Sequence, residues 1–467
     1  MCFVAGAQVA GTNIGTMADF AAVNYRVNEH LQSVDAQSWP GIATVPSGRG
    51  VRMRERRVEA AFARACSNAG IELNGAEPDI VIEHAALFTR IAASGWVGLA
   101  EGFMAGEWRA RDSHTLVDVL SALISHNYAP RTPSTTPKRG ADSDAYTGDI
   151  PADLVAHFAG DGMSAFQGHF ATGVPTTQRE RVKSQAKGAG KAGQPTHYFV
   201  DVTEFGAPQD AQRADLGDAQ RRSVEMLLGF AGVAAGTHLL EFPAGGGALA
   251  LRAAALRATV DAAANDVGVQ QAMEERLVFE GAAGGAHIEL IDASVPDAPE
   301  RFADRRRGVY DVVVGMERLE TLTDADKVRY LNAAATMLAP GGRVGLQTVL
   351  RTEAFNRTAE AALESLRAYI WPGLSYSSQE QLAKMVDRDT QLRIVARTHA
   401  PEHLAESLRL QRMTFDAHLR DAAADGYDIV FRRLWVWQFA LREALARLGM
   451  LDVSQVLLSP RNRRGRR

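Results

Sequence analysis

The chain has 467 residues, of which 46% are hydrophobic, and its net charge at pH 7 is −4. This length allows two or three domains with filled cores, and the slightly acidic balance gives no electrostatic reason to expect a nucleic-acid partner. Its two cysteines, Cys2 and Cys66, exclude a disulfide framework, and the chain lacks any run of about 18 apolar residues that would cross a membrane. We therefore expect a cytoplasmic protein, or one that sits on a membrane surface.

The first part of the chain divides into three regions of different composition. Residues 1–50 are mixed and punctuated by Gly, Ser and Pro, and we expect a poorly ordered extension there. Residues 51–127 have helical periodicity with a short strand at 80–82, which predicts a small N-terminal domain. Residues 128–195 contain several prolines and a Gly/Lys-rich stretch, a composition that predicts a flexible linker between two domains.

From 196 to 350 the chain alternates between helix and strand patterns. The predicted elements, in chain order, are a helix at 221–230, a strand at 237–241, a helix at 248–256, strands at 286–291 and 310–315, a helix at 324–338 and a strand at 343–350. Such alternation indicates a parallel sheet flanked by helices, so we expect an α/β fold with a Rossmann-like sheet.

A glycine cluster joins the 237–241 strand to the helix that follows it. The strand ends at Glu241, and Gly245 and Gly247 come shortly before the helix. Glycine lets the backbone turn tightly and approach a ligand, and a helix N-terminus presents free N–H groups, so the pattern is typical of a nucleotide-type cofactor loop. Pro243 stands where the usual acidic-x-Gly-x-Gly-x-Gly spacing has a glycine, and it removes one donor N–H. A glycine-rich turn without a ligand is the alternative interpretation.

The last part of the chain is rich in arginine and aromatic residues. Residues 351–458 are mainly helical in pattern, and we expect a helical cap on the core with Trp435 and Phe439 buried. Residues 459–467 form a basic tail with five arginines and no acid. Such a tail suits anionic lipid headgroups, and a solvated chain end is the alternative.

Three separated blocks of sequence follow one another in the order of a known family. They are Gly98-Leu99-Ala100-Glu101-Gly102-Phe103, the glycine cluster with Leu338-Ala339-Pro340-Gly341-Gly342, and Phe431-Arg432-Arg433-Leu434-Trp435 in the predicted cap. Together they resemble the cyclopropane-fatty-acid synthase family of class I S-adenosylmethionine (SAM) methyltransferases. The resemblance implies an enzyme that acts on unsaturated acyl chains of membrane phospholipids, with residues 51–127 as its lipid-side domain. In that family a methyl group passes from SAM to an isolated alkene, and a bound bicarbonate then takes a proton.

The resemblance implies a SAM site at the glycine cluster. Glu241, Gly245 and Gly247 would hold the cofactor, and Asp292 would bind the adenine amino group, because it follows the strand at 286–291. An ordinary helix cap is the alternative role for Asp292.

The resemblance also implies catalytic residues at the ends of two later strands. The family's glutamate after the 310–315 strand falls without a gap on Arg318, and with a shift of register on Glu317 or Glu320. The position after the Pro-Gly-Gly strand, often histidine, is Gln347. Glu317 and Gln347 are therefore the candidate catalytic residues.

Other positions of the family pattern are changed in this chain. His197-Tyr198 matches the start of the motif that opens the family's catalytic domain, but the site-lining tyrosine-serine segment is predicted to be absent between Pro208 and Ala219. Leu404 stands at the cap tyrosine and Gln411 at a nearby tryptophan. Two functions therefore stay open: an active SAM-dependent methyltransferase, or an inactive relative that serves as partner or scaffold for an active paralogue, in a homo- or hetero-oligomer.

Overall fold

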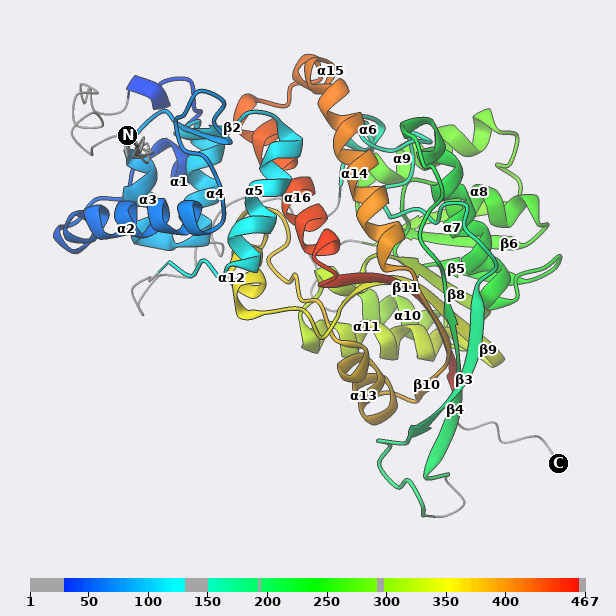
Figure 1. Cartoon of the computed structure of the whole chain (residues 1–467). Coiled ribbons are helices and arrows are strands. Elements are labelled where there is room, and N and C mark those ends of the chain that lie inside the picture. The colour runs from blue at the N-terminus through cyan, green and yellow to red at the C-terminus, as the bar shows by residue number, and fades with distance from the viewer. Residues whose placement is uncertain (1–28, 131–149, 192–194, 292–297, 462–467) are drawn as a thin grey trace, which may run out of the picture.

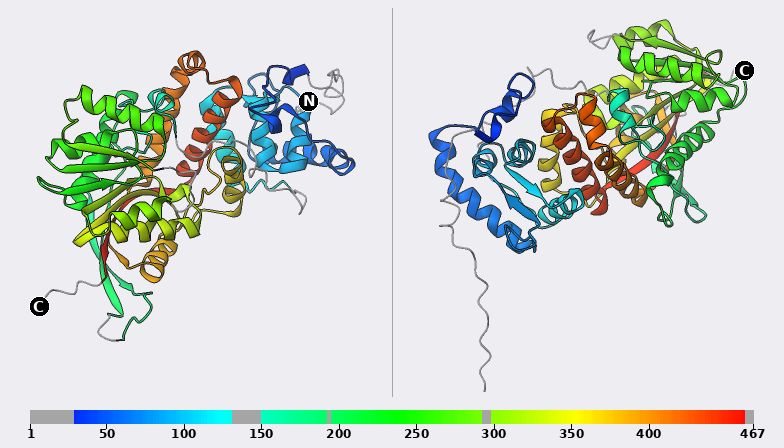
Figure 2. Two further views of the ribbon diagram at one scale, coloured as in Figure 1. Left: turned by 180° about the vertical axis from the view of Figure 1, so that it is seen from behind. Right: turned by 90° about the horizontal axis from the view of Figure 1, so that it is seen from above.

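The computed structural model describes residues 29–130, 150–191, 195–291 and 298–461. Figure 1 shows a large α/β unit with a smaller helical unit beside it, and the two further views in Figure 2 show the same arrangement from behind and from above. Asp292 lies outside the described residues, as do 1–28 and the arginines after Arg461.

The N-terminal unit combines helices with a two-stranded antiparallel sheet. Its elements are η2 (Glu29–Leu31), α1 (Pro40–Ala43), α2 (Arg49–Asn68), β1 (Ile80–Ile82), α3 (Ala86–Ser94), α4 (Trp96–Ala105), β2 (Trp108–Ala110) and α5 (Ser113–Ser125). The described end of the predicted extension belongs to this unit, because the buried Arg90 guanidinium donates to the carbonyls of Gly41, Ile42 and Thr44. A buried guanidinium needs acceptors, and this segment supplies them, so residues 41–44 are anchored.

Among the described residues, nine strands form the central sheet. In chain order they are β3 (Thr176–Lys183), β4 (His197–Glu204), β5 (His238–Glu241), β6 (Thr259–Ala264), β7 (Ala286–Leu290), β8 (Tyr310–Met316), β9 (Leu338–Arg351), β10 (Leu392–His399) and β11 (Leu451–Pro460). They lie side by side in the order β3-β4-β10-β11-β9-β8-β5-β6-β7. The strands from β9 to β7 are parallel, whereas β11 is antiparallel to both of its neighbours. The predicted Rossmann-like sheet is confirmed.

Helices cover both faces of the sheet (Figure 1). The helices that follow the N-terminal unit, some of which pack on other helices and not on the sheet, are α6 (Ala152–Ala156), α7 (Leu216–Ala231), α8 (Ala248–Ala255), α9 (Val267–Phe279), α10 (Ala298–Arg305), α11 (Asp324–Met337), α12 (Arg357–Tyr369), α13 (Gln379–Asp389), α14 (Pro401–Ala417), α15 (Leu419–Ala424) and α16 (Ile429–Arg447). Alternate side chains of β8 point to opposite faces: Val313 packs with α11 and α13, and Val312 and Val314 pack with α7 and α8. Two hydrophobic layers therefore hold the sheet between them.

The predicted linker and cap both contribute strands to this sheet. Within the predicted linker 128–195, β3 pairs with β4 along its whole length, so the described part of that region is not a bare linker. The region 351–458 contains helices α12 to α16, as expected, but β10 from its middle and β11 from its end lie inside the sheet. Every residue from Leu451 to Leu458 is buried, so β11 lacks the alternation that marks a half-buried strand.

The C-terminal helices also form the contact with the N-terminal unit. Trp437 of α16 packs against Phe103 and Trp108, and its Nε1 donates to Ser365 Oγ at 3.0 Å. The predicted burial of Trp435 and Phe439 is confirmed, since both side chains are about 1% exposed. One continuous hydrophobic cluster therefore joins the two units.

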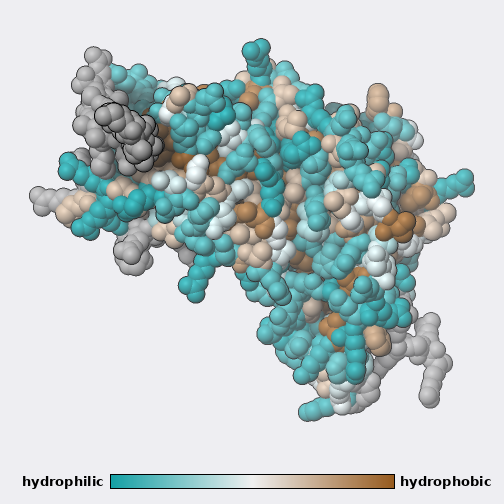
Figure 3. All heavy atoms as spheres, viewed as in Figure 1, coloured by the Kyte–Doolittle hydropathy of each residue, from teal (hydrophilic) through white to brown (hydrophobic). Residues whose placement is uncertain are grey.

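Within the described residues, the structure has no helix that combines the length and the apolar character needed to cross a membrane. The face seen in Figure 3 is mostly hydrophilic, with small separate hydrophobic patches.

Candidate active site

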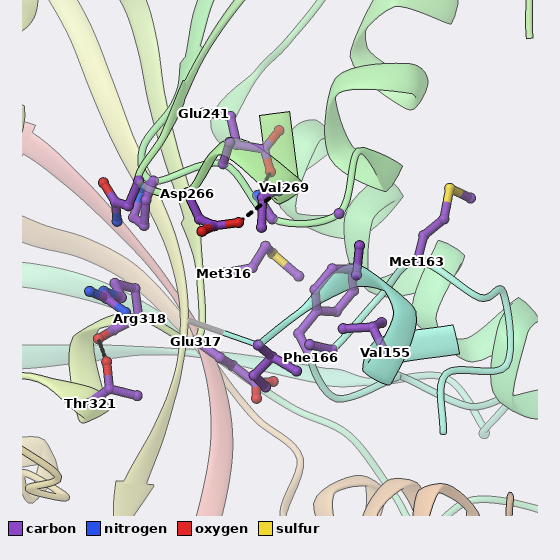
Figure 4. Close-up of a pocket in the computed structure, with 18 of the residues that line it drawn as sticks. Val155, Met163, Phe166, Glu241, Asp266, Val269, Met316, Glu317, Arg318 and Thr321 are labelled. Carbon is purple, nitrogen blue, oxygen red and sulfur yellow. Dashed lines mark hydrogen bonds between the residues drawn. The ribbon is translucent and has the colours of Figure 1, made fainter. Parts of the chain in front are cut away.

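A pocket opens at the carboxyl ends of β5, β6 and β8. Its walls include Glu241 from the end of β5, Asn265 and Asp266 after β6, and Met316 and Glu317 at the end of β8. Strand β5 lies between β6 and β8. The chain continues from β5 to β6 on one side, and β8 is added later on the other side, so the strand order reverses at β5. Ligands of open α/β sheets bind at such a switch point. Figure 4 shows side chains from these strand ends directed toward one space.

The glycine loop closes one side of the pocket. Glu241 is about 2% exposed, and its Oε1 accepts a hydrogen bond from the Gly245 N–H at 2.9 Å. Its second oxygen, Oε2, is buried and has no hydrogen-bond partner. Burial raises the pKa of the Glu241 carboxyl from 4.5 to about 8, although the backbone N–H groups of Gly245 and Ala250 act in the opposite direction. An orphaned carboxyl oxygen of this kind is suited to a cationic ligand.

The loop is packed closely against residues 160–163. Gly246 has a φ of 60°, and a Cβ at this position would lie 2.0 Å from the Met163 carbonyl oxygen. Arg276 of α9 joins the two segments, because its guanidinium donates to the carbonyls of Gly246 at 2.6 Å and Gly162 at 2.7 Å. Glycine at 246 is therefore required both by the backbone conformation and by this contact.

Pro243 lies in the pocket wall, where the expected glycine would offer an N–H. The residue before it is held firmly: the Phe242 carbonyl accepts from Tyr330 Oη at 2.6 Å, and the two rings stack with centroids 5.3 Å apart. The loop therefore lacks an N–H donor at Pro243, and Tyr330 holds the residue before it in place.

Glu317 and Gln347 meet in a buried network on the opposite side of the pocket. Glu317 Oε1 accepts from the Gln167 N–H at 2.6 Å and from Gln347 Nε2 at 2.9 Å. Gln347 is oriented by Gln455, whose Nε2 donates to Gln347 Oε1 at 3.0 Å. Glu317 has a φ of 47°, a conformation that is costly outside glycine and that clusters at functional sites. Burial raises the pKa of the Glu317 carboxyl above its usual value.

Cationic and aromatic side chains complete this side. Arg442 Nη2 lies 3.8 Å from Glu317 Oε2, and the guanidinium carbon is 5.7 Å from the centre of the Trp371 ring. Glu320 also lines the pocket, but its two oxygens accept from Thr348 Oγ1 at 2.8 Å and from a β9 backbone N–H at 3.1 Å. Burial, and then the nearby Glu317, raise the pKa of Glu320 to about 7.

An irregular segment, residues 160–170, brings Phe166 and the Gln167 N–H to the pocket, and we call it the strap. Side chains of α7 and α14 hold its backbone from both sides. On α14, His403, Ser407 and Gln411 stand four residues apart and bond to Phe170 N–H, to Gly168 N–H and to the carbonyls of Ala165 and Phe166. On α7, Gln220 accepts from Gly160 N–H and donates to the carbonyls of Ser164 and Phe166, while Ser223 Oγ donates to the Gln167 carbonyl.

The strap corrects the prediction of a flexible linker at 128–195, because this part of the predicted linker lines the pocket. His197-Tyr198 instead begins β4, which pairs with β3 and β10, and neither residue lines the pocket.

Of the predicted site residues, the structure brings Glu241, Gly245 and Glu317 into one pocket. Gln347 does not line the pocket but donates a hydrogen bond to Glu317 from behind the pocket wall, and Gly247 is the N-cap of α8. Asp292 lies outside the described residues. The residues that sequence reasoning missed are Phe166, Gln167, Asn265, Asp266, Trp371, Tyr376 and Arg442. A local signal existed for Asp266 alone: it follows an alanine-rich apolar run that forms β6.

Comparison with known proteins identifies the family of this chain. The model of the family described as mycolic acid cyclopropane synthetase matches residues 205–456, more than half of the chain. The chain belongs to this family. The predicted family, a family of SAM methyltransferases, is thereby confirmed.

Individual proteins are also similar to this chain. Tuberculostearic acid methyltransferase UfaA1 of Mycobacterium tuberculosis is 27% identical over 449 residues, which cover 91% of this chain and 95% of the relative. A structure of coclaurine N-methyltransferase bound to N-methylheliamine and SAH has a TM-score of 0.53 at 13% identity and covers 78% of this chain and 99% of that chain, a likeness of fold alone. Mycolic acid cyclopropane synthase CmaA1 complexed with SAH and CTAB is 18% identical, with a TM-score of 0.46, and covers 52% and 85%.

Proposed function

We propose that this cyclopropane synthetase family member is an active SAM-dependent methyltransferase that acts on an unsaturated acyl chain of a membrane phospholipid. One observation carries the proposal: Glu241, whose Oε2 has no hydrogen-bond partner, and the Glu317 network lie on opposite sides of one pocket, with apolar side chains in the wall between them. A cation site and a proton acceptor in one enclosed space are what methyl transfer to an alkene requires.

The residues of the glycine-loop side fit SAM. Glu241 Oε2 is a buried acceptor without a partner, which suits the ammonium or sulfonium charge of the cofactor. Asp266 Oδ1 caps α9 by accepting from Val269 N–H at 3.0 Å, and its position after the strand next to β5 suits ribose hydroxyls. Gly245 and Gly247 would let the backbone approach the ligand, and Asp292 is proposed for the adenine amino group. When bound there, SAM supplies an electrophilic methyl group.

The opposite wall fits an acyl chain. Val155 and Phe166 lie on one side of the pocket, as Figure 4 shows, and Trp371 and Leu374 add further apolar surface. Such apolar surface keeps water away from a carbocation. Glu317, held by Gln167 and Gln347, is the group on this wall that would accept a proton.

The alternative is an inactive relative that serves as a partner for an active paralogue. Pro243 in the cofactor loop and Leu404 at the cap tyrosine favour it, because each removes a hydrogen-bonding group of the family pattern. It becomes the preferred function if the chain binds no SAM.

Calorimetry with SAM separates the two functions. We expect micromolar binding by the whole chain and its loss in Gly245→Arg, which would fill the pocket and bring a cation to Glu241. Gly229→Arg, at an exposed glycine of α7, is the matched control and should bind normally. Absence of binding heat at millimolar SAM would contradict the proposal. Incubation with methyl-labelled SAM and unsaturated phospholipid vesicles should then transfer label to lipid.

We further propose peripheral attachment to anionic membranes through the basic tail. Arg461 itself is anchored, because it donates to the Asp387 and Thr390 carbonyls. The arginines after it would contact lipid, so sedimentation with anionic vesicles should weaken with salt and fall on truncation after Arg461. Equal binding to neutral vesicles would remove the tail from the explanation.

A further inference from the structure

The bicarbonate that the family resemblance implies does not fit the residues around Glu317. Two donors that face this point, the Gln167 N–H and the Gln347 amide, are already used by Glu317 Oε1. Leu404, at the position of the cap tyrosine, is fully buried in the hydrophobic core and supplies no hydroxyl. Arg442, the Tyr376 hydroxyl and the Gln167 side-chain amide remain nearby, but a guanidinium beside Glu317 attracts an anion without orienting it. A second anion would also be repelled by the Glu317 carboxylate.

The Glu317 carboxylate is itself surrounded by the hydrogen-bond donors that a bound anion of similar shape would need. Its Oε1 is fixed by two donors, and each donor is fixed in turn. The Gln347 amide is oriented by Gln455, and the Gln167 peptide is held through its carbonyl by Ser223 Oγ at 3.0 Å and Gln347 Nε2 at 2.8 Å. With Oε1 held in this way, Oε2 is the oxygen that stays able to take a proton.

Glu320 does not share this property. It lies in the same wall and is more buried than Glu317, but Thr348 and the Val349 N–H occupy both of its oxygens and tie it to β9. Of the two glutamates, Glu320 has both oxygens in hydrogen bonds to β9, whereas Glu317 Oε2 lies 3.8 Å from Arg442 Nη2 and is the oxygen that faces a cation. Burial raises the pKa of Glu317, which makes it a stronger base than an exposed glutamate.

We propose that the Glu317 carboxylate is the built-in base of this site and that the enzyme works without bicarbonate. The inference rests on the proposed function, because it assigns a step of that reaction. After methyl transfer the acyl chain carries a carbocation. To close a cyclopropane ring, a C–H bond of the transferred methyl group breaks and its electron pair bonds that carbon to the cationic carbon. To form a double bond, a C–H bond on a carbon attached to the cationic carbon breaks instead. In either case the proton passes to Glu317 Oε2. No oxidant or other reactant is needed, and Glu317 returns the proton to solvent after turnover.

The first experiment measures methyl transfer in buffer freed of carbon dioxide and in the same buffer with added bicarbonate. We expect rates that agree within about two-fold. Glu317→Gly should lower the rate by about 100-fold or more, the usual range for loss of a general base, and formate or bicarbonate should restore at least about ten-fold. Glycine suits the positive φ at 317, so this variant opens the anion's place with little backbone cost. Glu317→Gln is the matched control: its amide fills the space, and added anions should not rescue it.

A second experiment measures anion binding without turnover. We expect the saturation-transfer signal of ¹³C-bicarbonate or ¹³C-formate to be absent with the wild-type protein and present with Glu317→Gly, while calorimetry with SAM confirms that the variant is folded. Bicarbonate-dependent turnover, or bicarbonate binding by the wild-type site, would overturn the inference. If the wild-type protein transfers no methyl group in either buffer, the proposed function fails. The binding comparison then decides whether Glu317 occupies the anion's place.

Discussion

Replacing Glu241 by glutamine should stabilise the protein without SAM, and the gain should depend on pH. The carboxyl is buried with Oε2 unpartnered, and its pKa is raised from 4.5 to about 8. A raised folded-state pKa means that the native protein binds more protons than the unfolded chain between these two values. Stability is therefore lost as pH rises from about 4.5 to about 8, and it is constant above. Glutamine keeps the acceptor for Gly245 N–H and removes the titration.

The magnitude follows from the shift. Each pKa unit corresponds to about 1.4 kcal/mol, so the variant should gain at most about 3 kcal/mol at pH 7 and less than about 1 kcal/mol at pH 5. Thermal and urea unfolding of both proteins from pH 5 to 9 measures this difference. Glu353→Gln, at an exposed glutamate, is the control and should show no growing gap. A Glu241→Gln gain that is the same at pH 5 and pH 8 would refute the reasoning.

Three further outcomes test the same site. SAM binding should release a proton from Glu241, so the affinity for SAM should rise with pH between about 6 and 8. The calorimetric heat of SAM binding should then vary with the ionisation enthalpy of the buffer. A heat that does not depend on the buffer would contradict this. Gly246→Ala should abolish SAM binding, because the new Cβ would lie 2.0 Å from the Met163 carbonyl, whereas Gly281→Ala, also at positive φ but in open space, should cost stability alone. Gln220→Leu removes the side-chain partner of the Ser164 carbonyl and of the Gly160 N–H, whereas the Phe166 carbonyl keeps Gln411. The variant should therefore lose about 1–3 kcal/mol of stability, and its kcat should fall more than its SAM affinity. An unchanged unfolding midpoint would argue against the role of the strap.

Local features of the sequence predict four of the nine strands in the central sheet, β5, β7, β8 and β9. The strand ending at Glu241, the glycines after it and the Pro-Gly-Gly sequence, which lies within β9, are each encoded within a few neighbouring residues, by apolar runs and by glycine conformation. Strand β6 escaped prediction because its alanine-rich sequence has neither β-branched residues beyond Val260 nor alternation.

The strap is the clearest case of a feature that sequence patterns could not predict. Its glycines and polar residues resemble a linker, since it forms no helix and no strand of its own. Its backbone is satisfied by side chains such as Gln220 and Gln411, which are about 50 and 250 residues away along the chain. A pattern within the segment cannot report partners at such distances.

The sequence by itself determined the α/β class, the family and the cofactor-type loop, because these depend on periodicity, turns and short motifs. The tertiary structure decided which groups share a pocket. It placed Glu317 between the Gln167 N–H and Gln347, set Arg442 beside it, and used Glu320 for β9 instead. The physical reason is that the proton affinity of a carboxyl and the partners of its oxygens are set by burial and by contacts across the fold, which residue spacing along the chain does not specify.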